Sequence, residues 1–180
     1  MKMKKPLFAI FLLALAGCGS APEPSVDATA EFKPVLDKMY AAWSTLDPSK
    51  VAPYYAKDAT LVFFDVAPFK YTGWKEYEEG FKKVTADWKS ITVSVNPDLK
   101  ATKNGNIVLV TYSLSFDIEP KTGDHMKAQL RGTDVFEKRG PGWLVIHEHV
   151  STVMPDPPPA PTKKKAKAVR GKAARKKARN

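Results

Sequence analysis

Cysteine is almost absent from this sequence. The 180 residues include one cysteine, Cys18, which excludes an intramolecular disulfide framework. The chain also lacks a phosphate-binding loop, a nucleophile elbow and a cysteine nucleophile, which argues against phosphoryl and acyl transfer. The apolar run from Leu7 to Leu15 is too short to cross a bilayer stably as a mature helix.

The first 18 residues instead have the pattern of an exported lipoprotein. Three lysines precede the apolar run, as in a secretory signal peptide. Leu15-Ala16-Gly17-Cys18 then resembles the bacterial lipobox, in which small residues admit the signal peptidase and the thiol receives a diacylglyceryl group. We therefore expect residues 1–17 to be a signal peptide and lipid on Cys18 to anchor the protein in a membrane. The alternative is an ordinary secretory signal with a cysteine beside its cleavage site.

The residues after Cys18 indicate where in the cell envelope the protein would lie. Gly19 is not the aspartate that, by resemblance to lipoproteins of enteric bacteria, retains such proteins at the inner membrane. We therefore expect a position at the cell envelope, on the outer membrane facing the periplasm if the organism is Gram-negative. Residues 18–28 are small, polar and proline-containing, which predicts a flexible lipidated spacer.

Positive charge is concentrated at the other end of the chain. Ten of the 29 basic residues lie between Lys163 and Asn180, where there is no acidic residue. Residues 18–162 hold 16 basic and all 19 acidic residues, which leaves a net charge of −3. The composition predicts a disordered basic tail at 163–180, preceded by a stiff proline-rich linker at 155–162.

The expected compartment decides which partner this tail would meet. An exported lipoprotein contacts anionic lipids and envelope polymers, and about 1 kcal/mol of attraction for each charge near such a surface would give strong binding. This argues against nucleic acid as the partner. The alternative is a solvated end without a partner.

Hydrophobic periodicity places helices before strands in residues 29–154. Apolar residues recur at helical spacing over 29–46 and 74–88, and a short helix is expected from Pro48. β-branched and aromatic residues favour strands at 60–66, 90–95, 107–118, 126–138 and 143–154. This order predicts an α+β domain in which the N-terminal helices pack on one face of a curved antiparallel sheet.

The last predicted hairpin has the most specific motif. Arg-x-Thr-x-Val-aromatic begins at Arg131, and Trp-x-x-x-His-x-His-x-Ser begins at Trp143 after a Lys-Arg-Gly turn. With the order of elements, residues 29–154 resemble the nuclear-transport-factor-2-like superfamily, in its SnoaL-like branch near ketosteroid-isomerase homologues and the association domain of calcium/calmodulin-dependent protein kinase. The resemblance implies a cone-shaped sheet with a pocket between its concave face and the helices. The fold hosts isomerases, dehydratases, cyclases and binding modules, so it leaves the activity open.

Strand alternation assigns the residues of this hairpin to two faces. The resemblance implies that Arg131, His147 and His149 line the pocket. Alternation then directs Asp134 and Glu148 away from the pocket.

The opposite face of the last strand suggests an interface. Alternation gives it Leu144, Ile146 and Val150, and an apolar strand face in water would be an interaction patch. The resemblance also implies dimers through the outer sheet face. We therefore expect a homodimer through these side chains, which sedimentation would test.

The His147 and His149 pair has three possible roles. Two imidazoles about 6 to 7 Å apart could bridge one metal ion, but no third ligand is evident, so we expect no metal and no cofactor. A neutral histidine beside Arg131 could act as a general acid or base. The third possibility is that both are hydrogen-bonded members of a polar cavity.

Asp65, Trp43 and Tyr55 complete the expected pocket. Asp65 ends a predicted strand near the cavity mouth, and the two aromatic residues would supply apolar surface. Beside Arg131, such a pocket suits an apolar small molecule that carries a carboxylate. We expect a module for ligand binding or self-association. The alternative is an isomerase, dehydratase or cyclase that uses one histidine with Asp65.

Overall fold

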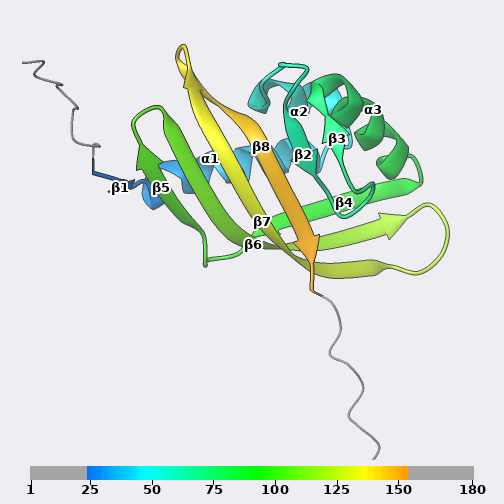
Figure 1. Ribbon diagram of the computed structural model, residues 1–180. Coiled ribbons are helices and arrows are strands. Elements are labelled where there is room, and N and C mark those ends of the chain that lie inside the picture. Colours follow the sequence, from blue (N-terminus) through cyan, green and yellow to red (C-terminus); the bar gives the residue numbers. More distant parts are fainter. Residues whose placement is uncertain (1–23, 154–180) are drawn as a thin grey trace, which may run out of the picture.

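Three long consecutive strands form the centre of the sheet (Figure 1). In the computed structural model, which describes residues 24–153, β6 pairs along its length with β7, and β7 pairs with β8. The strands are β6 Ile107–Pro120, β7 Met126–Arg139 and β8 Gly142–Thr152. Alternating side chains are buried along β6 and in β7 from Leu130 on, as a sheet with one covered face requires.

Five shorter strands complete a curved, unclosed sheet. β5 and β4 pair with opposite halves of β6, β1 pairs with β5, and β2 carries β3 at the other edge. Their bounds are β1 Val26–Asp27, β2 Val62–Phe64, β3 Tyr71–Thr72, β4 Trp88–Val95 and β5 Lys100–Asn104. β2 runs parallel to β8 at this edge, whereas the other strand pairs of the sheet are antiparallel.

The helices cover the concave face. They are α1 Thr29–Trp43, α2 Pro48–Val51 and α3 Gly73–Thr85, with a 3-10 turn at Ala52–Tyr54. The buried side of α1 carries Phe32, which packs edge to face against Phe136 of β7 and Trp143 of β8. Burial of one such side chain stabilises the fold by roughly 1.5 to 3 kcal/mol. The predicted α+β architecture is confirmed.

A β-bulge in β8 changes which of its residues face the core. Val135 of β7 pairs with His147, but the next residue, Phe136, pairs with Val145. Ile146 is therefore an extra residue, and side chains beyond it have the opposite orientation to that expected from regular alternation. Val145 is buried before the bulge, whereas Glu148 is buried after it.

The bulge also changes the face expected to form a dimer. Leu144 and Ile146 are half-buried, but Val150 lies in the core and cannot belong to an outward patch. Dimerisation itself stays a prediction.

The terminal predictions lie outside the described residues. These are the signal peptide 1–17, lipidation of Cys18, the linker 155–162 and the basic tail 163–180. Residues Val26–Asp27 of the expected spacer form β1. No helix within 24–153 is sufficiently long and apolar to span a membrane.

Gly132 provides a test of packing between the central strands. It pairs with Tyr112, whose ring lies over it, and a Cβ at this position would be 2.3 Å from Tyr112 Cζ. We expect Gly132→Ala to lower the free energy of unfolding by roughly 1 to 3 kcal/mol in urea denaturation, because Tyr112 is buried and must move.

Gly142→Ala is the matched control. It also lies in a strand, and a Cβ there meets no atom within 4 Å. We expect a change within about 0.5 kcal/mol. Equal losses in the two variants would contradict the packing argument.

Candidate functional site

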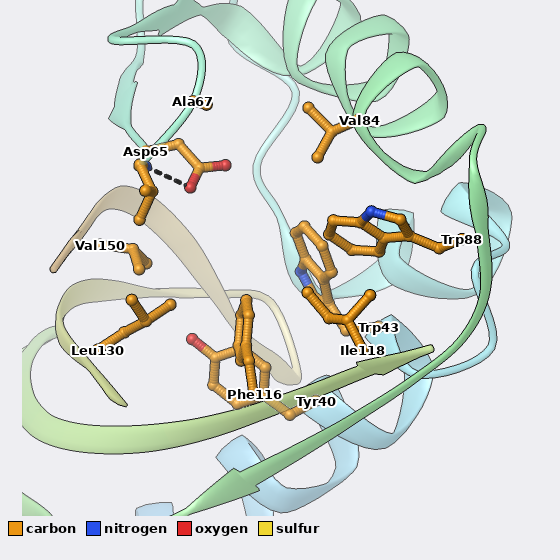
Figure 2. Close-up of a pocket in the computed structure, with 11 residues that line it drawn as sticks. Tyr40, Trp43, Asp65, Ala67, Val84, Trp88, Phe116, Ile118, Leu130 and Val150 are labelled. Carbon is orange, nitrogen blue, oxygen red and sulfur yellow. Dashed lines mark hydrogen bonds between the residues drawn. The ribbon is translucent and has the colours of Figure 1, made fainter. Parts of the chain in front are cut away.

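A pocket of about 180 Å³ lies between the helices and the concave face of the sheet (Figure 2). α1 and α3 form one side, β4, β6, β7 and β8 form the other, and the loop after β2 closes one end. The lining side chains are almost all apolar or aromatic: Tyr40, Trp43, Asp65, Val66, Ala67, Val84, Trp88, Phe116, Ile118, Leu130 and Val150. An apolar cavity of about 150 Å³ can hold benzene, so this one has room for a ring with a short substituent.

Asp65 is the charged side chain in this lining. Figure 2 shows its carboxyl group directed into the pocket, with the Val66 backbone N–H donating to Oδ1 at 2.6 Å. Burial raises the pKa of Asp65 to about 6, although the hydrogen bond from the Val66 backbone lowers it. None of the described lining residues carries a positive charge.

Glu148 forms a second buried acidic site beside the pocket. It is 2% exposed, and it accepts hydrogen bonds from Tyr55 Oη at 2.5 Å and Tyr77 Oη at 2.9 Å. Burial raises the pKa of Glu148 to about 7, and the negative charge of Asp65 adds to this effect. The hydrogen bonds from the two tyrosine hydroxyls lower this pKa, because they stabilise the charged carboxylate.

Asp134 of β7 is, with Glu148, one of the two buried carboxyl groups of the described residues. Tyr112 Oη donates to its Oδ2 at 2.9 Å, and the hydroxyls of Tyr112 and Tyr40 are 2.5 Å apart. Burial raises the pKa of Asp134 well above its usual range, with a further contribution from Glu148. Asp134 Oδ1 has no hydrogen-bond partner among the described residues. The buried polar residues of the described region include no basic side chain.

The structure places two of the six expected pocket residues in this pocket. Trp43 and Asp65 line it, whereas Tyr55 lies behind it with its hydroxyl on Glu148. Arg131 is on the outward face, where it donates to the Thr152 carbonyl at 3.3 Å. The expectation that Arg131 lines the pocket is therefore corrected, because the inner face of β7 is the one that carries Asp134.

His147 and His149 also face outward. The bulge at Ile146 turns them away from the core, and they lie with Phe64 and Asp65 in an open surface hollow. His147 Nδ1 is 2.7 Å from the Val62 carbonyl oxygen, which fixes the ring against β2. Asp65 borders both hollows, but the histidines do not line the pocket between the helices and the sheet.

Metal binding has no support in the described region. No group of three or more His, Cys, Asp or Glu side chains within residues 24–153 is arranged to hold an ion. Asp134 and Glu148 have tyrosine partners, and Asp65 has a backbone partner.

Sequence reasoning assigned Asp134 and Glu148 to the wrong face. For Asp134 a signal was available, because it alternates with Leu130 and Phe136, and apolar residues mark the buried side of a strand. For Glu148 regular alternation gave the wrong answer, since the position of the bulge depends on pairing with β7.

Comparison with known families agrees with this geometry. Residues 33–157 match the model of the SnoaL-like domain. The chain belongs to the SnoaL-like domain family. The predicted resemblance is therefore confirmed. No curated protein matches the chain.

Solved structures with the same fold come from several bacteria. A nuclear transport factor 2-like superfamily protein from Salmonella enterica is 16% identical with a TM-score of 0.66, over 74% of this chain and 96% of that one. A structure from Streptomyces avermitilis, provisionally assigned as a dehydratase of this superfamily, is 16% identical with a TM-score of 0.62, over 71% and 96%. A provisional calcium/calmodulin dependent protein kinase II association domain from Xanthomonas campestris is 26% identical with a TM-score of 0.53, over 71% and 88%.

The buried acid Glu148 predicts a pH-dependent stability. Its pKa is higher in the folded than in the unfolded chain, so the folded state binds more protons between about pH 4.5 and 7. Stability should therefore fall as pH rises through this window. Between about pH 5 and 8, the free energy of unfolding of Glu148→Gln should fall by roughly 1 to 3 kcal/mol less than that of the wild type. Urea denaturation at each pH would measure it.

Glu79→Gln, at an exposed position of α3, is the control and should leave the pH profile unchanged. Retention of the complete wild-type profile by Glu148→Gln would show that this carboxyl group is not the source.

Proposed function

We propose that the SnoaL-like domain binds a small, largely apolar molecule in the pocket that Asp65 and Trp43 border, and that lipid on Cys18 holds it at the cell envelope. The observation that carries the binding function is the pocket itself, an apolar space with one carboxyl group directed into it. Binding sites for small molecules commonly combine apolar walls with a few placed polar groups.

An unpaired hydrogen-bond donor supports the same proposal. Trp43 is 8% exposed, and its Nε1 has no partner among the described residues. Buried polar groups are nearly always paired, so an unpaired indole N–H in a pocket wall calls for a ligand or a water molecule. Trp43 is held by its edge-to-face contacts with Phe81 and Tyr77.

Val84 offers a way to fill the pocket without touching its polar groups. It projects from α3 into the space (Figure 2). We expect the wild-type chain to bind the neutral probe 2-phenylethanol with a Kd on the order of 1 mM or below. Val84→Phe should weaken binding at least about tenfold in calorimetry, because the new ring occupies the space.

Leu109→Phe is the control, since Leu109 is 44% exposed on β6 and lies outside the pocket. Its affinity for the probe should equal that of the wild type. An absence of binding to the wild type, or equal binding by Val84→Phe, would sink the pocket proposal.

Acid-base catalysis is a second candidate function. The observation that favours it is a carboxyl group in an apolar pocket whose pKa is raised to about 6, where it can exchange a proton near neutral pH. The dehydratase assignment of the Streptomyces avermitilis structure is compatible with such a role. The catalyst in this account is Asp65, without His147 or His149. Recovery of a natural ligand in a chemically altered form would favour it over binding alone.

The envelope anchor rests on the lipobox that ends at Cys18. We expect Cys18→Ala to remain unprocessed or to leave the membrane, because no thiol is available for the diacylglyceryl group. Mass spectrometry of the N-terminal peptide and membrane fractionation would measure both effects. A processed Cys18→Ala product that still requires detergent for extraction would contradict lipidation at this site.

The basic tail is proposed to bind anionic lipids or polymers of the envelope. Without lipid on the cysteine, residues 19–180 should bind vesicles containing phosphatidylglycerol, and a chain ending at Pro161 should bind at least about tenfold more weakly. Binding should also weaken between about 50 and 500 mM salt, because charge attraction is screened over a few ångströms at high salt. Equal binding by the two chains would leave the tail as a solvated end.

A further inference from the structure

The walls of the pocket combine aromatic faces with a single carboxyl group. Tyr40, Trp43, Trp88 and Phe116 supply the aromatic surface, and Asp65 supplies the charge. Figure 2 shows the Asp65 carboxyl and the two indoles on opposite sides of the pocket. Aromatic faces attract cations through their ring quadrupoles, so both kinds of wall favour positive charge.

The surroundings of the pocket do not oppose this preference. Asp134 and Glu148 lie in the interior behind the lining, and the negative charge of Asp65 contributes to the raised pKa of Glu148. No lysine, arginine or histidine of residues 24–153 is buried, so no basic side chain neutralises these acids within the core. Arg131, which could have bound the carboxylate of an anionic ligand, is on the outer face. An anionic ligand would meet the Asp65 carboxylate without a cationic partner in the core.

We propose that the pocket is built for a compact organic cation, a primary amine on an apolar ring, whose ammonium group is held by Asp65 and whose ring lies against the aromatic walls. This inference rests on the proposed ligand-binding function and specifies the ligand class. The volume of about 180 Å³ limits the ligand to one ring with a short side chain. With a pKa of about 6, the Asp65 carboxyl group is mostly ionised at pH 7.5 before any ligand enters.

Three probes of similar shape separate charge from size. They are 2-phenylethylamine, 2-phenylethanol and phenylacetate, which are positive, neutral and negative at pH 7.5. Calorimetry would use the full processed chain in phosphatidylcholine nanodiscs, with empty nanodiscs as the blank. We expect the amine to bind at least about tenfold more tightly than the alcohol, and phenylacetate to bind more weakly than both.

Asp65→Asn tests whether this carboxyl group sets the preference. The affinity of this variant for the amine should fall to its affinity for the alcohol. Its affinity for the alcohol should change less than about threefold, which would show that the pocket is intact. Asp124→Asn removes the same charge at an exposed position between β6 and β7, and it should leave the order of the probes unchanged.

The outcomes distinguish the two proposals. Binding of the alcohol equal to or tighter than that of the amine would overturn the cation inference and leave the pocket function in place. A lack of binding by all three probes would contradict the pocket function and the inference with it. An amine preference that survives in Asp65→Asn would also overturn the inference, because the charge responsible would lie elsewhere.

Discussion

The extra residue Ile146 in β8 is the constraint on which the site depends. Before it, Val145 faces the core, and after it, Glu148 and Val150 do so. The same change of orientation puts His147 and His149 on the outer surface. A strand without the bulge would carry histidines into the core in place of Glu148, and the tyrosines of the helical layer would face a different partner. The chemistry of the interior is therefore set by one backbone irregularity.

Burial of Asp134 and Glu148 without a basic partner is costly, and the core offsets this cost with tyrosine hydroxyl groups. Tyr55 and Tyr77 donate to Glu148, and Tyr112 donates to Asp134. Hydrogen bonds to a charged group contribute roughly 1.5 to 3 kcal/mol each, yet they do not prevent the pKa of both acids from rising. Asp65 has only its backbone bond among the described groups and borders free space, so it is the acid available to a ligand.

The sequence predicted the architecture better than the site. Long periodic segments such as α1 and β6 identified the α+β fold, and the final hairpin motif identified the family. The short strand β5, Lys100–Asn104, was not predicted, because its polar residues form a strand only through pairing with β6. Asp65 was placed in the pocket from its position at a strand end and Trp43 as an aromatic residue, whereas Glu148 depended on a bulge that local alternation cannot reveal.

The central claim is that the interior of this domain holds acids that keep their protons to unusually high pH. Carbon-detected NMR titration of the side-chain carboxyl groups would measure this directly for Asp65 and Glu148. The account predicts midpoints of about 6 for Asp65 and about 7 for Glu148. Midpoints near 4 for both residues would place them in water or beside a cation, and would contradict the account.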